Sequence, residues 1–232
     1  TLFEPEFSLR AFSLGTLLAW MAAAAVLFGS VLAIAQSDFR RMLAYSSVSQ
    51  MGYILLGISL ASANGFAGAL LHILNHGVMK ADLFLVAAAL MCRTGGRDIH
   101  GLRGLHRRMP LTAAALAVGA FSMVGVPPTC GFFSKWYLLQ GCLEADRWPF
   151  AAVILISSLL TAVYFFRVVE MVYFREGPQP ETPEGREPVK REEAPLSMRI
   201  SLGMLALGQI LLGLFNERIV AGIIRPAVPF PF

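Results

Sequence analysis

Residues 65–92 read GFAGALLHILNHGVMKADLFLVAAALMC, and this run decides the fold class. As a helix it rises about 1.5 Å per residue and reaches roughly 42 Å, more than the roughly 30 Å hydrocarbon core of a bilayer. The run is mostly apolar, but its interior holds His72, His76, Lys80 and Asp82. It therefore predicts a membrane-spanning helix that carries ionisable groups at depth.

Long apolar runs recur on both sides of this segment. The further predicted spans are residues 11–35, 42–62, 149–174 and 200–224. The chain is 56% hydrophobic and only 15% charged, against roughly 25% charged for an average soluble domain. Its mean hydropathy is +0.63. This composition excludes an ordinary water-soluble protein.

Residues 109–143 form one further, interrupted crossing. The apolar stretch 111–126 and the helical stretch 131–143 flank Pro127-Pro128-Thr129, and two adjacent prolines cannot lie inside a continuous helix. Each half is too short to span a bilayer comfortably. The pattern predicts a discontinuous helix with a break at 125–131, a feature typical of transporter sites. A loop outside the bilayer between two short helices is the alternative. The predicted fold is an all-α polytopic transmembrane helix bundle of about six crossings.

Charges between the spans predict the topology. Asp38, Arg40 and Arg41 follow the first span. The link after the third span is strongly basic and contains Arg93, Arg97, Arg103, Arg107 and Arg108. Residues 62–65 carry no charge. The positive-inside rule places both basic links in the cytoplasm and 62–65 outside. A nucleic-acid-binding patch is disfavoured because bilayer spans flank both links, so no nucleic-acid partner is expected.

The C-terminal part divides into a loop and a last span. Residues 175–198 are rich in Pro and Glu with mixed charge, which predicts a polar flexible loop. Residues 199–232 are predicted to hold the C-terminal transmembrane helix and a tail. Residues 1–174 form the main bundle.

A row of titratable groups is the candidate functional feature. His72, His76 and Lys80 are four residues apart and so share one helix face. Lys80 lies near the midplane, where burial destabilises its charged form enough for it to gain and lose a proton near neutral pH. Histidine titrates near neutrality unaided. The three predict a proton relay; buried groups bonded to a neighbouring helix are the alternative.

Other ionisable groups have less specific readings. Lys135 follows the predicted break and is a candidate exchange site that meets water on one side, or an interfacial lysine. Arg167 and Glu170 are three apart, which favours an ion pair between them, although Glu170 could instead pair with Lys135. Asp82 faces away from Lys80 and is a candidate for a structural ion pair or for tuning.

Metal and cofactor sites are not expected. His72 and His76 have the HxxxH spacing of a zinc site but lack a third ligand or a glutamate base. Haem in a bundle takes axial ligands from opposed helices, whereas these histidines share one helix. The three cysteines have no metal or disulfide spacing. No nucleophile or nucleotide loop is present, so the chain is not expected to catalyse bond chemistry.

Three ordered motifs resemble a known family. They are SDFRRMLAYSSVSQMGYILLG (37–57), HILNHGVMKADLFLVAAAL (72–90) and GVPPTCGFFSKWYLL (125–139). They resemble the antiporter-like membrane subunits shared by respiratory complex I (NADH-quinone oxidoreductase) and the multisubunit sodium/proton antiporters. The stretches RRMPLTAAALAVGAFSMVGVPPT and RVVEMVYF look closest to the D-type subunit of the cation/proton antiporters or to the N-type subunit of complex I. The likeness covers residues 11 to about 174.

The resemblance implies a bundle of two inverted repeats, each with a broken helix, crossed by a mid-membrane row of lysines, histidines and glutamates. Lys80 matches the family's mid-membrane lysine, and His72 and His76 match its connecting relay. Lys135 matches the terminal lysine of the second broken helix, which exchanges protons with the external side. Arg40 departs from the lysine that relatives often have. Residues 1–174 correspond to the second repeat alone, so another chain supplies the first repeat or the sequence is a piece of a longer protein.

The sequence thus predicts a proton, or monovalent cation/proton, translocating subunit of a multisubunit antiporter or redox-driven pump. Its expected partners are other membrane subunits, the lipid bilayer, protons and Na⁺. Its expected location is the bacterial inner membrane. A non-conducting structural membrane subunit is the alternative. Whether the parent complex is an enzyme of the NADH-quinone oxidoreductase or hydrogenase type stays open, and no cofactor is expected in this chain.

Overall fold

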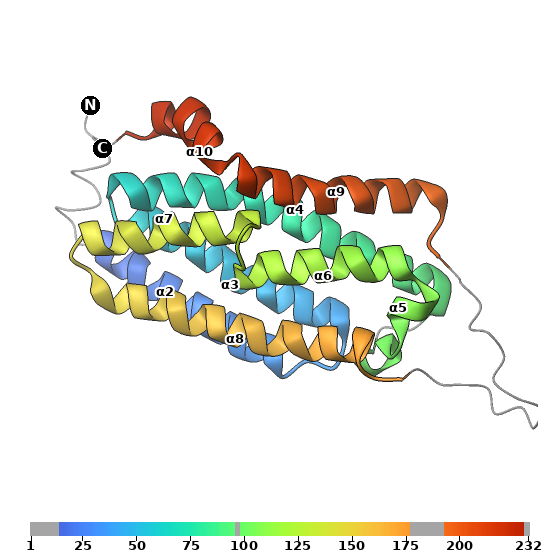
Figure 1. Cartoon of the computed structure of the whole chain (residues 1–232). Coiled ribbons are helices and arrows are strands. Elements are labelled where there is room, and N and C mark those ends of the chain that lie inside the picture. The colour runs from blue at the N-terminus through green and yellow to red at the C-terminus, as the bar shows by residue number, and fades with distance from the viewer. Residues whose placement is uncertain (1–13, 96–97, 177–192, 230–232) are drawn as a thin grey trace, which may run out of the picture.

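The structure, a computed structural model, describes residues 14–95, 98–176 and 193–229. Within these ranges the chain forms helices and helical turns and no named strand. The helices lie nearly parallel to one long axis (Figure 1). The long ones are α2 (Leu14–Ile34), α3 (Phe39–Ser59), α4 (Ala63–Thr94), α8 (Trp148–Tyr173) and α9 (Leu196–Leu214). The all-α prediction is confirmed.

Local sequence signals fix the ends of α3 and α4. Asp38 caps α3 by accepting hydrogen bonds from the backbone N–H groups of Arg40 and Arg41, at 2.8 and 3.1 Å. Ser62 caps α4 through the N–H of Gly65. Gly95 ends α4 in the left-handed region, with φ of 63°. The short links therefore turn the chain sharply between neighbouring antiparallel helices.

Four helices in the described ranges are long and apolar enough to cross a membrane. They are Leu14–Ile34, Ala63–Arg93, Trp148–Tyr173 and Leu196–Leu214. α3 is as long as α2 but more polar, and it packs between α2 and α4. Its polar side chains Ser46, Ser49 and Gln50 are fully buried. With α3 and the interrupted crossing, the described chain makes the six crossings that the sequence predicts.

The interrupted crossing consists of α6 (Pro110–Val124) and α7 (Cys130–Glu144). The two halves meet near the middle of the bundle (Figure 1). Gly125 ends α6 with φ of 93°, a conformation that suits glycine. A Cβ atom at Gly131 would overlap the carbonyl group of Ser122, so α7 begins directly against the last turn of α6. The predicted discontinuous helix is present, and the alternative of a loop outside the bundle does not fit.

The two basic links lie at one end of the bundle. The second contains a 3-10 turn, η1 (Ile99–Leu102), and α5 (Leu105–Arg108). The N–H of Ile99 donates to the carbonyl oxygen of Ser37 in the first link at 2.9 Å. The N–H of Gly104 donates to the carbonyl oxygen of Met171 near the end of α8. The uncharged link between α3 and α4 lies at the opposite end (Figure 1), as the charge pattern requires.

The C-terminal part differs from the sequence prediction. α9 begins at Leu196, before residue 199, and ends at Leu214, so the expected span 200–224 is wrong in its second half. The consecutive polar residues Asn216, Glu217 and Arg218 follow, and the chain turns away from the bundle axis (Figure 1). It continues as α10 (Asn216–Ile219), a π-helical turn (Val220–Ile224) and a 3-10 turn (Arg225–Ala227). The predicted loop 175–198 lies mostly outside the described residues.

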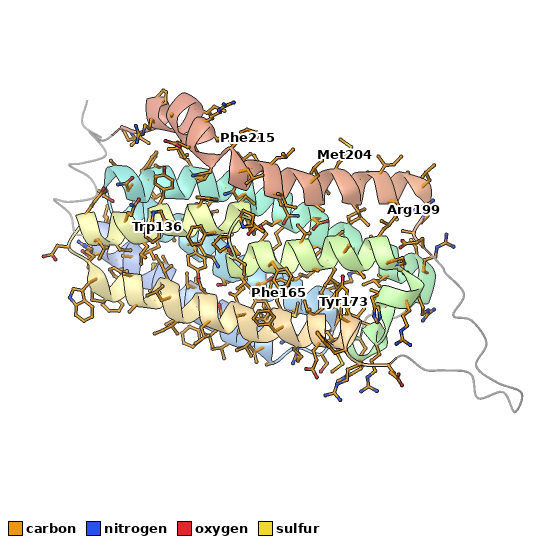
Figure 2. All side chains as sticks on the ribbon, in the orientation of Figure 1. Trp136, Phe165, Tyr173, Arg199, Met204 and Phe215 are labelled. Atoms are coloured by element: carbon orange, nitrogen blue, oxygen red, sulfur yellow. The ribbon has the colours of Figure 1, made fainter. Side chains whose placement is uncertain are left out.

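The outer surface is apolar. Phe28 and Leu159 are each 68% exposed and Met204 is 69% exposed. Met204 lies on the outward side of α9 (Figure 2). Exposed apolar area on this scale indicates contact with lipid or with other membrane subunits. The protein is an integral membrane helix bundle with its polar groups turned inward.

Candidate functional site: a buried polar file

The ionisable groups of α4 lie inside the bundle. α4 packs against α3, α6, α7 and α9, so it is the central helix. His72 is fully buried, and His76 and Lys80 are each 7% exposed. The four-residue spacing stacks the two histidine rings at a centroid distance of 6.2 Å and an interplanar angle of 19°. The structure therefore places these groups along one buried helix face.

Lys80 finds its hydrogen-bond acceptors on α3. Its Nζ donates to the carbonyl oxygen of Leu43 at 2.7 Å and to the hydroxyl of Ser46. The Nζ also lies 5.8 Å from the centroid of the Phe84 ring. A buried ammonium needs such acceptors, because an unsolvated charge in the bilayer is costly. Both the ammonium and the neutral amine carry N–H groups that can donate to these acceptors, so either form of Lys80 fits this site.

His72 lies between α3 and α7. Its Nε2 is 3.0 Å from Gln50 Oε1, and its Nδ1 is 2.9 Å from Ser134 Oγ. Because Gln50 Oε1 can only accept, Nε2 carries a hydrogen, and the Ser134 hydroxyl can donate to Nδ1 of the neutral ring or accept from it when the ring is charged. The Nδ1 of His76 has no hydrogen-bond partner among the described residues.

Lys135 lies in the second turn of α7 and reaches back across the break. Its Nζ donates to the carbonyl oxygens of Met123 and Val124, at 2.8 and 3.0 Å. These carbonyls are at the C-terminal end of α6, where helix carbonyls lack intrahelical partners and the helix dipole is negative. The Nζ also lies 5.3 Å from the centroid of the Tyr53 ring. The break therefore creates a binding site for the Lys135 amine, and the interfacial alternative does not fit a side chain 7% exposed.

Ring contacts and helical spacing join these groups into one file. His76 lies one helical turn from Lys80 and stacks on His72. The Tyr53 ring lies 5.5 Å from the His72 ring and 5.3 Å from Lys135 Nζ. The file thus runs from the Lys80 site on α3 to the helix break. Its members repel one another when charged, so a proton on one group opposes a proton on the next.

Asp82 lies on another side of α4 from Lys80. It is fully buried, and its Oδ2 accepts a hydrogen bond from Gln209 Nε2 of α9 at 2.9 Å. No ion pair of Asp82 is formed within the part of the chain that the structure describes. The expected structural ion pair is therefore replaced by a carboxyl–amide contact. The reason is that α9 covers this side of α4 with an amide rather than a cation.

Arg167 and Glu170 do not pair with each other. Arg167 donates to the carbonyl oxygens of Ile34 and Gln36 where α2 ends. Glu170 forms an ion pair with Arg175 at 2.9 Å, and both side chains are about half exposed. The predicted pair is wrong because the free carbonyls at the end of α2 attract the guanidinium. Glu170 is equally not a partner of Lys135, whose acceptors are backbone carbonyls.

Sequence reasoning missed the partners of the file. Ser46, Gln50 and Tyr53 of α3 and Ser134 of α7 contact its titratable groups and are fully buried. A usable signal was present, because Ser46, Ser49, Gln50 and Tyr53 recur at helical spacing inside a predicted span. Among the described residues no three His, Cys, Asp or Glu side chains are grouped to hold a metal ion.

Comparison with known families decides the classification. The family described as NADH:quinone oxidoreductase/Mrp antiporter, TM matches residues 5–161, about two thirds of the chain. The chain belongs to this family. The matched region contains the buried file from His72 to Lys135, together with most of the bundle.

Several relatives carry the name subunit N. The chain is 50% identical over 219 residues to NADH-quinone oxidoreductase subunit N of Desulforudis audaxviator, covering 92% of this chain and 44% of that protein. It is 33% identical to F(420)H(2) dehydrogenase subunit N of Methanosarcina mazei, covering 90% of this chain and 43% of that one. The family resemblance is confirmed. These relatives carry the subunit N name, and neither name is that of the D-type antiporter subunit.

Solved structures show the same architecture. The Mrp complex of Dietzia sp. contains a chain that matches with a TM-score of 0.84 at 25% identity, over 93% of this chain and 46% of that one. Respiratory complex I of Thermus thermophilus contains one with a TM-score of 0.79 at 30% identity, over 91% and 43%. The chain thus spans less than half the length of the relatives that it matches.

Proposed function

We propose that this chain carries protons across the bilayer along the file Lys80–His76–His72–Lys135, as a membrane subunit of a larger complex. The single observation that carries the proposal is the burial of two lysine amines at the middle of a lipid-facing bundle, each without a carboxylate partner among the described residues. Burying an amine in a membrane costs free energy whether or not it has a function. An ionisable residue at this depth therefore indicates a functional site. Membership of the family supports the same function.

The geometry supports a stepwise electrostatic mechanism. Lys80 and Lys135 are each bound by backbone carbonyls that stabilise an ammonium, while burial stabilises the neutral amine. Two opposing effects of this kind keep both protonation states accessible. Because like charges repel, a charged Lys80 disfavours a proton on His76 one turn away, and the same holds between His72 and Lys135 on either side of Tyr53. A proton therefore moves on as the next one enters.

The parent assembly is proposed from the relatives. Those reported above are subunits of NADH-quinone oxidoreductase, of F(420)H(2) dehydrogenase and of an Mrp complex. We place this chain with other membrane subunits in a redox-driven pump or a multisubunit antiporter, in a bacterial cell membrane, with residues 1–174 as the second antiporter-like repeat. Sodium would enter as a co-transported cation, since the file itself consists of proton carriers. Any redox cofactor would belong to other subunits.

The test replaces each lysine in the assembled complex. Lys80→Met and Lys135→Met each keep the apolar part of the side chain as far as Cε but remove the amine. Each variant should assemble and lose proton transport, measured as acidification or alkalinisation inside proteoliposomes. Lys190→Met, in the charged stretch 175–198, is the matched control and should transport as the wild type does.

The rival function predicts another pattern. In a structural subunit the amines would only hold helices together, so either substitution would lower assembly or leave transport intact. Full transport by an assembled Lys80→Met variant would contradict the proposal. A proton flux that depends on Na⁺ would assign cation/proton exchange rather than proton pumping alone.

A further inference from the structure

The face of α4 that carries Asp82 presents a second polar contact, separate from the histidine–lysine file. Asp82 and Gln209 are both fully buried and share one hydrogen bond of 2.9 Å, from Gln209 Nε2 to Asp82 Oδ2. The remaining oxygens, Asp82 Oδ1 and Gln209 Oε1, are buried and have no hydrogen-bond partner in the described part of the chain. The contact therefore contains two buried acceptors and lacks one donor.

Protonation of the carboxyl group supplies that donor. A carboxylic acid can pair with a primary amide through two hydrogen bonds, one from the amide N–H and one from the acid O–H. An ionised carboxylate can only accept, so it would leave Asp82 Oδ1 and Gln209 Oε1 without a donor and keep a charge in a membrane interior. The neutral acid thus matches the composition of this contact, and the carboxylate does not.

No cation compensates Asp82 from the elements packed on it. α6 approaches so closely that a Cβ atom at Gly119 would lie 2.7 Å from Asp82 Oδ2, and α6 contains no titratable side chain. α9 contains one, Arg199, ten residues before Gln209 and so about 15 Å away along the helix. On α4 the neighbouring cation, Lys80, is two residues away and is bound to α3.

The same contact helps to hold α9 in place. Only Leu202, Gln209 and Gly213 are buried along α9. Gly213 packs against the break in the interrupted helix, because a Cβ atom there would overlap the carbonyl oxygen of Pro128. α9 therefore connects the Asp82 contact to the break that precedes Lys135. Few residues of α9 are fully buried, and one of them contacts the Asp82 carboxyl group.

We propose that Asp82 is a proton-binding site outside the transport file, held as a neutral carboxylic acid paired with the Gln209 amide, and that this proton keeps α9 docked over the helix break. This inference goes beyond the proposed function and does not rest on it. The ligand is a single proton, and its loss would leave a buried, unpaired carboxylate at the α4–α6–α9 contact.

Isotope-edited infrared spectroscopy tests the protonation state directly. The chain contains four aspartates, Asp38, Asp82, Asp98 and Asp146, so ¹³C labelling of aspartate carboxyl groups in this chain of the intact complex gives few bands. At neutral pH one labelled group should show the C=O stretch of a protonated acid, and Asp82→Asn should remove it. A spectrum with carboxylate bands alone would overturn the proposal, whether or not the variant folds.

The pH dependence of stability tests the docking role. The folded protein would hold a proton that the unfolded chain releases, so stability should fall as pH rises. This decline begins at about pH 4, where the unfolded carboxyl group ionises. Asp82→Asn reproduces the paired amide geometry without a titratable proton, so its melting temperature should lose this decline. Glu217→Gln, at an exposed acid, should decline as the wild type does. An Asp82→Asn variant with the wild-type pH slope would overturn the docking role.

The outcome is separable from the proposed function. Loss of transport in Lys80→Met together with an absent acid band would uphold the file and reject the Asp82 site. A persistent acid band in a protein whose lysine variants still transport would uphold the Asp82 site and reject the file.

Discussion

Lys80 and Lys135 are equally buried, but they obtain their acceptors in different ways. Lys80 lies inside an uninterrupted helix and donates hydrogen bonds to a carbonyl and a hydroxyl of the neighbouring α3. Lys135 lies next to a broken helix and takes the carbonyls that the end of α6 leaves free. A buried amine thus needs either a polar neighbouring helix or a break in its own crossing.

The largest effect is expected from closing the space at the break. Gly131→Ala places a Cβ atom on the backbone carbonyl of Ser122, which cannot yield as a side chain could. Overpacking of this kind costs about 1–3 kcal/mol and can cost more. We expect reduced assembly and a lower melting temperature. Gly203→Ala on α9 has open space around it and should be neutral or slightly stabilising; equal behaviour of the two variants would argue against a packed break.

A smaller effect is expected where the break bends the backbone. Gly125→Ala forces alanine to φ of 93° and brings its Cβ atom to 3.3 Å from Lys135 Cδ. The strain costs about 1–3 kcal/mol, and the contact displaces the lysine, so transport should fall as well. Gly95→Ala has a similar strain at φ of 63° with nothing near its Cβ. Gly95→Ala should lower the melting temperature yet leave transport per assembled complex unchanged. If Lys135 had only a structural role, Gly125→Ala would also leave transport per assembled complex unchanged.

The Ser46→Ala variant tests the contribution of α3 to the Lys80 site. This change removes the hydroxyl acceptor of Lys80 and leaves the Leu43 carbonyl. Hydrogen bonds to charged groups contribute about 1.5–3 kcal/mol, so the ammonium form should become harder to populate. Proton flux should then reach its maximum at a more acidic pH. Ser201→Ala on the exposed side of α9 is the control, and an unchanged pH profile in Ser46→Ala would remove Ser46 from the Lys80 site.

The smallest effect is expected at the surface. Arg175→Gln breaks the half-exposed pair with Glu170, and exposed pairs contribute about 0–1 kcal/mol. Its melting temperature should change little. Arg167→Gln removes contacts with the two carbonyls at the end of α2 and should be clearly more destabilising. The reverse order would show that the Glu170 pair, and not the α2 contact, stabilises this end of α8.

Sequence reasoning succeeded where one helix determines the outcome. The four-residue spacing of His72, His76 and Lys80 and the paired prolines both act within a single crossing, and both predicted the observed local structure. It failed where a neighbouring helix decides the partner. Arg167 was assigned to a residue on its own helix, although free carbonyls on α2 compete more strongly for it.

The same limit explains the other differences. The contact between Gln209 and Asp82 depends on how α9 crosses α4. Residue spacing within either helix does not predict that crossing. The end of α9 at Leu214 was missed because apolar residues resume after Asn216, Glu217 and Arg218. A prediction from hydropathy alone therefore extended the last span beyond Leu214, where the structure has a turn.

The protonation states of the lysines test the central claim most directly. The chain contains three lysines, Lys80, Lys135 and Lys190, so ¹⁵Nζ labelling of this chain in the membrane-embedded complex gives three resolvable nitrogen signals. We predict that the Lys80 and Lys135 signals change between ammonium and amine across the neutral pH range, while Lys190 stays an ammonium. Three permanently charged ammonium groups over that range would contradict a proton-carrying file.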